Sequence, residues 1–227
     1  MDNPDFKKRY ERPILSNFLY FVCAMTICNN ITPHSTRGRT MNIKPLTLTA
    51  VSLAILSGCG SESYSDHKDK SMASFLKLSQ PARKEVVTGY INQENIKDKK
   101  ESFYSCVSQM AFTKSQSIPL SIVMGWCKND YHQGTLSQYT NFDSFEKGFS
   151  SWDGSYRELE KLVKHRMNDP KSYEHIRTTY RFELNSQKPA IAIIKTEFRG
   201  KNQFGSIVLD QVMASIDVKT GAVIELM

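Results

Sequence analysis

The fold of this chain is decided by residues 190–217, AIAIIKTEFRGKNQFGSIVLDQVMASID. Two runs rich in β-branched residues flank the glycine-containing segment 200–205, which has the length of a hairpin connection. Ile207 and Leu209 stand at odd-numbered positions, whereas the alternating apolar residues that follow stand at even-numbered positions, which point to the other face of a strand. This change of parity predicts a β-bulge at residues 210–211. The segment therefore predicts two antiparallel strands, 190–199 and 206–217, joined by a turn.

The same alternating pattern continues on both sides of the hairpin. Extended segments are predicted at residues 173–184 and 222–226. The polar segment 185–189 and the Lys-Thr-Gly sequence at 219–221 supply the turns between strands. The chain is therefore expected to form a sheet of three or four antiparallel strands.

One amphipathic helix precedes these strands. Ser155 and Glu158 have the spacing of a capping box, in which both side chains bond free N–H groups at a helix start. Apolar residues at helical spacing follow, and Pro170 ends the pattern. This stripe consists of Tyr156, Leu159, Val163 and Met167. Residues 151–227 are therefore predicted to form an α+β domain, with the helix packed on the sheet.

Residues 79–150 carry three shorter helical patterns, and the last two contain Cys106 and Cys127. Because each cysteine lies on an apolar stripe, the pair predicts an N-terminal helical hairpin pinned by a disulfide. Closing a loop of this length stabilises a fold by roughly 3 kcal/mol in the chain-entropy model. The alternative is a metal site formed by the two cysteines and His132, which lacks a fourth ligand.

Residues 41–59, MNIKPLTLTAVSLAILSGC, have the three-part layout of a secretory signal. Lys44 gives a positive start, an apolar run follows, and small residues precede Cys59. The tetrapeptide Leu56-Ser57-Gly58-Cys59 resembles the lipobox of bacterial lipoproteins. This resemblance implies that the Cys59 thiol receives a diacylglyceryl group and that the chain is cut before it. Fatty acyl chains such as palmitate then hold the protein on a bilayer.

The lipobox resemblance divides the first part of the chain. Residues 1–40 are either an over-called start, with translation from Met41, or a leader that acts as a signal anchor. Residues 41–58 are the predicted signal peptide, and the polar residues 59–78 are a predicted flexible tether. Gly60 after the acylated cysteine implies outer-membrane sorting, with the body facing the periplasm. The alternative is a membrane-spanning helix with an accidental cysteine.

The net charge of +7 does not indicate nucleic-acid binding. Seven of the 30 basic residues and three of the 23 acidic residues lie in residues 1–58, so only +3 remains on the rest of the chain. No basic run is long enough to follow a phosphate backbone. The chain also lacks H-E-x-x-H and G-x-S-x-G motifs, so we expect neither an enzyme nor a cofactor or metal site.

The candidate contact site is the tip of the predicted hairpin, formed by Arg199, Lys201, Asn202 and Phe204. A basic turn with one aromatic residue, carried on a rigid sheet, is typical of a loop that binds an acidic or carbohydrate partner. The alternative is an ordinary solvated turn.

The order of signal, tether and small α+β body is similar in layout to envelope lipoproteins that act as assembly accessories. We therefore expect a non-enzymatic, lipid-anchored binding module with an envelope protein or glycan as its partner. One alternative is a hydrolase of envelope substrates, with His175 and Glu174 as acid–base candidates. Another is an exclusion or immunity lipoprotein.

Overall fold

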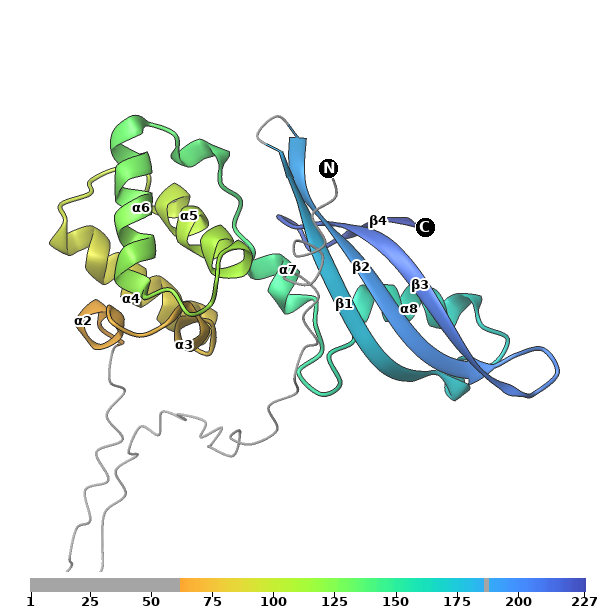
Figure 1. Cartoon of the computed structure of the whole chain (residues 1–227). Coiled ribbons are helices and arrows are strands. Elements are labelled where there is room, and N and C mark those ends of the chain that lie inside the picture. Colours follow the sequence, from red (N-terminus) through yellow and green to blue (C-terminus); the bar gives the residue numbers. More distant parts are fainter. Residues whose placement is uncertain (1–61, 186–187) are drawn as a thin grey trace, which may run out of the picture. The chain divides into compact units, whose positions relative to one another are not determined.

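The protein consists of helices followed by an antiparallel sheet, which confirms the α+β class (Figure 1). The computed structural model describes residues 62–185 and 188–227. The helices are α2 (Tyr64–His67), α3 (Met72–Leu76), α4 (Gln80–Gln93), α5 (Lys100–Thr113), α6 (Leu120–Gln133), α7 (Asp143–Lys147) and α8 (Arg157–Arg166), with 3-10 turns η1 (Leu136–Gln138) and η2 (Pro170–Ser172). The strands are β1 (Glu174–Asn185), β2 (Lys188–Lys201), β3 (Ile207–Asp217) and β4 (Val223–Leu226). The predicted leader, signal peptide and lipidated Cys59 lie outside the described residues.

Helices α4, α5 and α6 form the main helical layer, as their apolar patterns predict. α4 begins after Ser79, whose hydroxyl accepts a hydrogen bond from the Ala82 N–H. α6 ends at Gly134, whose φ of 73° is the left-handed conformation that commonly terminates helices. The shared core between these helices contains Val86, Val87, Ile91, Phe103, Val107, Leu120 and Val123. No helix in the described part of the chain is long and apolar enough to span a membrane.

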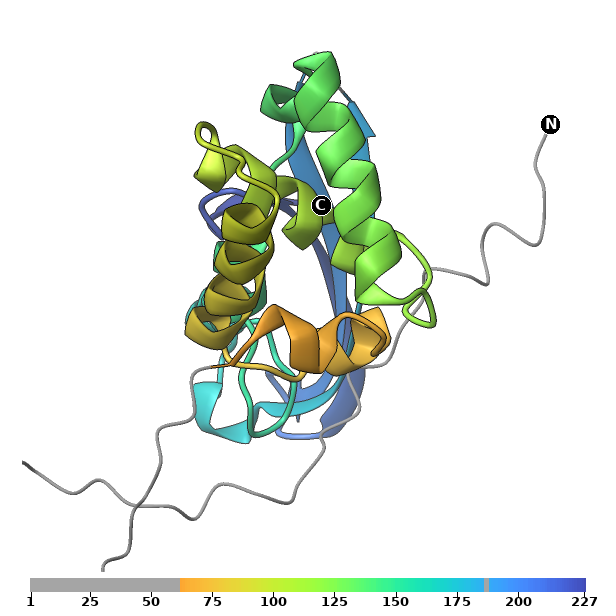
Figure 2. The same cartoon turned by 90° about the vertical axis from the view of Figure 1, so that its left-hand side faces the viewer.

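The predicted flexible tether is wrong for residues 64–67 and 72–76, which form α2 and α3. Met72 is fully buried and Phe75 nearly so, and both belong to the helical core. The Met72 N–H donates to the Ile118 carbonyl at 2.9 Å, and the Leu120 N–H donates to the Lys70 carbonyl at 2.9 Å. Figures 1 and 2 show these two short helices at one end of the helical layer. The polar composition of this segment predicted no structure, because two isolated apolar residues form a helix only when tertiary packing buries them.

A disulfide joins Cys106 of α5 to Cys127 of α6, with an S–S distance of 2.05 Å. This confirms the predicted pairing, and both cysteines are fully buried. The bridge lies inside a larger helical region, because α2, α3 and α4 precede it. The predicted N-terminal hairpin is therefore supported only as a disulfide within the helical region.

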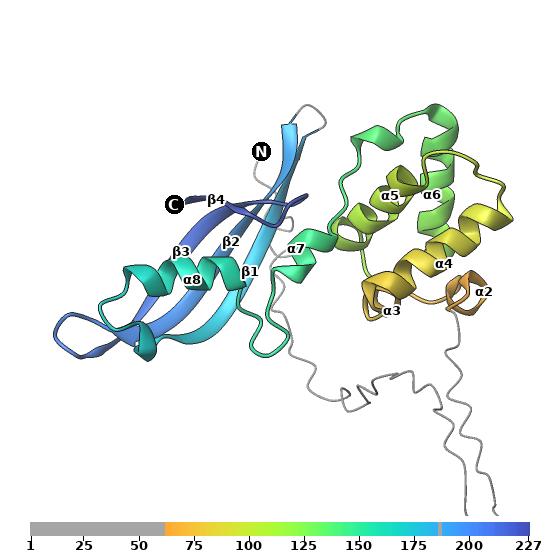
Figure 3. The ribbon, with the colours of Figure 1, turned by 180° about the vertical axis from the view of Figure 1, so that it is seen from behind.

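The sheet has strand order β1-β2-β3-β4, with antiparallel neighbours throughout. Even-numbered residues of β2 such as Ala192 and Ile194 are fully buried and pack against Tyr156 and Leu159 at the start of α8. Figure 3 shows α8 lying along one face of the sheet. Its predicted capping box is wrong, because the Ser155 hydroxyl bonds to carboxylates of neighbouring acidic residues and not to the helix backbone.

The apolar core of the sheet begins before the predicted boundary at residue 151. Phe142 and Phe145 are fully buried in it. Phe112 of α5 stacks on Phe142 with ring centroids 5.4 Å apart and contacts Phe182 of β1 edge-on at 6.4 Å. Residues before the predicted domain boundary therefore contribute aromatic side chains to the core of the sheet.

The predicted bulge at residues 210–211 is absent from the pairing of β2 with β3. The register runs without a shift from the Lys201–Ile207 pair to the Ile191–Asp217 pair. Because side chains alternate along a regular strand, Ile207 and Leu209 project from the face opposite α8. The change of apolar parity thus marks exposed apolar residues rather than an extra residue in the strand.

Candidate functional site at the β2–β3 hairpin

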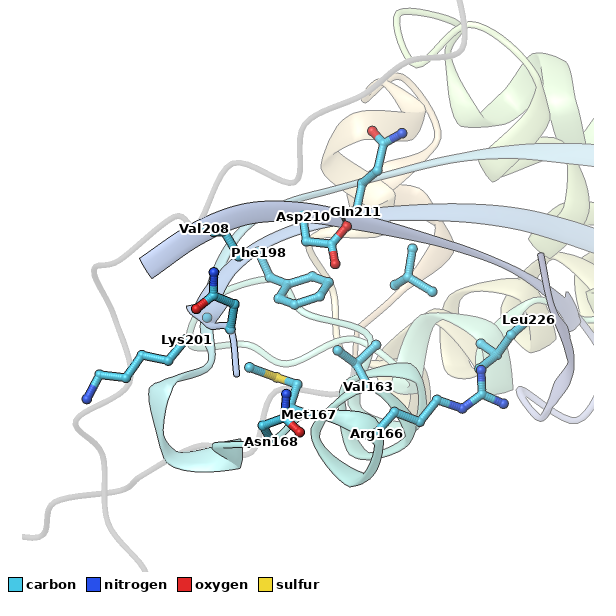
Figure 4. A pocket seen from close by; sticks show the side chains of 13 residues that line it. Val163, Arg166, Met167, Asn168, Phe198, Lys201, Val208, Asp210, Gln211 and Leu226 are labelled. Atoms are coloured by element: carbon cyan, nitrogen blue, oxygen red, sulfur yellow. Dashed lines mark hydrogen bonds between the residues drawn. The ribbon is translucent and has the colours of Figure 1, made fainter. Parts of the chain in front are cut away.

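A groove of about 320 Å³ lies between α8 and the hairpin formed by β2 and β3 (Figure 4). We call it the hairpin groove. Its lining is mixed: the apolar part comes from Val163 of α8, Met167 after it, Phe198 of β2 and Val208 of β3, and six of the thirteen lining residues are polar or charged. Leu226 of β4 lines the groove as well. Binding sites commonly combine apolar surface with polar groups that orient the ligand.

The hairpin groove exists because the sheet extends further than its covering helix. α8 ends at Arg166, and Met167 directly after it packs against the core of the sheet. Gly200 permits this contact, since a Cβ atom there would come within 2.2 Å of the Met167 Cε atom. Beyond this point, Val208 of β3 is exposed and not covered by a side chain from the helix.

Charged side chains stand at the rim of the hairpin groove. In Figure 4, Lys201 lies near one end and Arg166 lies near the other, close to Leu226. The Lys201 ammonium lies 3.8 Å from an Asp169 carboxylate oxygen, whereas no carboxylate among the described residues lies within 4.0 Å of the Arg166 guanidinium. Asp210 is the acidic residue of the lining, and its carboxylate accepts a hydrogen bond from the next backbone N–H at 2.7 Å. The rim therefore favours a ligand with negative ends.

The same hairpin carries an exposed apolar surface, which we call the hairpin patch. It consists of Ile207 and Leu209 on the face opposite α8, Phe204 in the turn, and the basic residues Arg199 and Lys201, of which Lys201 also lines the hairpin groove. Phe204 is 82% exposed, Ile207 69% and Leu209 67%. The register sets Ile207 opposite Lys201 and Leu209 opposite Arg199, so the apolar and basic side chains lie side by side. Contiguous exposed apolar residues of this kind mark interaction sites.

The structure separates the four residues of the predicted contact site by role. Arg199, Lys201 and Phe204 are exposed on the hairpin, as a contact surface requires. The Asn202 side chain accepts hydrogen bonds from the Phe204 N–H at 2.9 Å and the Ser206 N–H at 3.0 Å. Asn202 therefore shapes the turn. Sequence reasoning missed Ile207 and Leu209, although their unexpected parity was the available signal.

His175, an acid–base candidate, lies in a second hollow of about 330 Å³ lined by Asp153 and Thr178 but not by Glu174. Its Nε2 atom is 2.8 Å from the Thr178 hydroxyl oxygen, which is itself 3.1 Å from the hydroxyl of Thr196. Thr178 is only 3% exposed, so the hydroxyl is not presented to a substrate. Burial lowers the pKa of His175, and the Asp153 carboxylate opposes this shift.

The described residues contain no group of three potential metal ligands. Cys106 and Cys127 are joined to each other, so neither thiolate is free to coordinate an ion with His132. Comparison with models of protein families, with curated proteins and with solved structures finds no match for this chain.

Proposed function

We propose that the mature protein is a lipid-anchored, extracytoplasmic binding module that recognises another envelope protein through its β2–β3 hairpin. The observation that carries this proposal is the hairpin patch. It sets two exposed apolar side chains beside two basic ones on a regular strand pair, with the exposed Phe204 in the adjoining turn. Such a surface is costly to leave in water unless a partner covers it.

Two further observations support an anchored protein outside the cytosol. The lipobox-like sequence precedes a body with a buried disulfide, and such bonds persist in oxidising compartments. α2 begins at Tyr64, so five residue steps separate it from Cys59. At roughly 3.3–3.6 Å per extended residue, this connection reaches at most about 18 Å. An acylated Cys59 would therefore hold the folded body close to the bilayer surface.

Photo-crosslinking in intact cells tests the binding function. The photoreactive residue p-benzoyl-phenylalanine is placed at Phe204 in the full chain, and the same residue at Ile122 is the control. Ile122 is a matched position, because it is an apolar residue of α6 that is 47% exposed. We expect a discrete adduct from position 204, none from position 122, and at least a tenfold loss of the adduct when Ile207→Asp is added. Equal adducts from both positions contradict the proposal.

Metabolic labelling tests the anchor independently. Cells fed a palmitate analogue should label the wild-type chain and not Cys59→Ser, and the variant should leave the membrane fraction. Retention of label in Cys59→Ser would show that the lipid is attached elsewhere or that no lipobox operates.

A further inference from the structure

The two edges of β3 differ in how far they are paired. β2 pairs with β3 along its whole length, from Ile207 to Asp217. β4 has four residues and pairs only with Ala214, Ser215 and Ile216. Within the described part of the chain, the outer edge of residues 207–212 therefore has no neighbouring strand.

Hydrogen bonds at the ends of the strand show which backbone groups face this free edge. The Asn202 N–H donates to the Ser206 carbonyl at 2.9 Å, and the Val218 N–H donates to the Ala190 carbonyl at 3.1 Å. Antiparallel pairing alternates, so even-numbered residues of β3 bond to β2 and odd-numbered residues face outward. On the other side, the Met227 N–H donates to the carbonyl of an odd-numbered residue, Met213, at 2.8 Å.

Ile207, Leu209 and Gln211 consequently direct their backbone groups toward the free edge. The Gln211 N–H is satisfied by the Asp210 carboxylate, which leaves the N–H and C=O groups of Ile207 and Leu209 as a strand template. Edge strands in proteins are usually shielded by lysine, proline, bulges or a covering element. Here the first three exposed residues of the edge are Ile207, Val208 and Leu209 in an unbroken register, and the charged Asp210 follows them.

The hairpin groove lies beside this free edge. Val208 and Val212 face the groove from β3, and Leu226 of β4 contributes its side chain from the ladder position on the same edge. A strand added next to residues 207–211 would continue the line of β4. Its alternate side chains would point into the groove as Leu226 does, and the others would lie beside Ile207 and Leu209.

We propose that the free edge of β3 binds an extended, acidic-ended segment of a partner protein by β-strand addition, with its apolar side chains in the hairpin groove. The proposal rests on the binding function proposed above. Charge identifies the occupant, since Lys201 and Arg166 stand near the two ends of the groove and Asp210 is the acidic residue between them. Carboxylates near the ends of the partner segment complement these cations, whereas a segment with basic ends would be repelled.

The test uses the purified full-length chain in detergent and a fluorescein-labelled nine-residue peptide of alternating Val and Thr with Glu at each end. Fluorescence anisotropy should show binding that is at least tenfold weaker for Leu209→Pro than for Leu209→Val. Proline removes the outward N–H, which β2 does not use, whereas valine keeps it. The same peptide with Lys at both ends should bind at least fivefold more weakly to the wild type.

Two readouts remain decisive if Leu209→Pro does not fold. A peptide with N-methylated amides along one edge should lose at least tenfold in affinity for the wild type. The N–H groups of Ile207 and Leu209 should exchange with deuterium at least tenfold more slowly once peptide is bound. Equal binding by the methylated peptide, or unchanged exchange at both residues, overturns strand addition.

Other occupants give different results. Self-association in sedimentation that Leu209→Pro abolishes would assign the edge to a second copy of this chain. Binding of the peptide-free protein to phosphatidylethanolamine–phosphatidylglycerol vesicles, lost in Phe204→Ser, would assign the hairpin to a lipid surface. Both results overturn the peptide proposal. If the crosslink at position 204 survives Leu209→Pro but not Ile207→Asp, the binding module stands and strand addition fails.

Discussion

Removing the Cys106–Cys127 disulfide should lower the free energy of unfolding by about 3 kcal/mol. The cysteines are 21 residues apart, and loop closure over that separation restricts the unfolded chain by this amount in the chain-entropy model. The double variant Cys106→Ala/Cys127→Ala is the perturbation. With a urea slope of about 2 kcal/mol per molar, the midpoint of unfolding should fall by roughly 1.5 M.

Urea denaturation followed by circular dichroism measures this change, with and without a phosphine reductant. Reductant should shift the midpoint of the wild type but leave the alanine variant unchanged. Because both cysteines are fully buried, the native protein should resist reduction until it opens. A loss below 1 kcal/mol, or two thiols that react at once in the native state, would refute the reasoning. The predicted loss also means that the fold is substantially weaker in a reducing compartment.

Two other perturbations test the core and the histidine hollow. Gly148→Ala should lower the free energy of unfolding by about 1–3 kcal/mol, because the new Cβ atom would lie 2.3 Å from the ring of the fully buried Tyr156. The control is Gly125→Ala in α6, which has open space around the new methyl group and should raise the free energy of unfolding by up to about 1 kcal/mol. Equal shifts of the melting temperature in the two variants would contradict the packing described for Gly148. Burial holds the pKa of His175 below its usual value, so the folded protein prefers the neutral imidazole. The folded state is therefore fully stable above the unfolded pKa near 6.5, and it loses stability as the pH falls toward the lower pKa of the folded state. NMR titration should give a midpoint below 6.5 for His175, and the unfolding free energy of His175→Gln should change less between pH 5 and 7.5; a midpoint above 6.5 contradicts the burial argument.

The local sequence determined most of the secondary structure. The four strands and the helices at α4, α5, α6 and α8 follow from apolar periodicity, turn residues and helix ends, which act within a few neighbouring residues. The disulfide could also be predicted from the sequence, because Cys106 and Cys127 are the two cysteines on apolar helical stripes of the body. The short helix α3 could not be predicted from the sequence, since five residues are too few for a stable helix without the core that buries Met72 and Phe75.

The sequence located the candidate site at the hairpin tip, but only the tertiary structure decided how far it extends. The alternation of apolar residues showed that Ile207 and Leu209 stand at positions of the opposite face from the apolar residues after them. It cannot distinguish a β-bulge from an exposed apolar face. The difference depends on which face α8 covers and on how far β4 extends along β3, and neither is a local property. The hairpin groove likewise joins Arg166 to Val208, residues that are far apart in the chain and that only the packing of helix on sheet brings together.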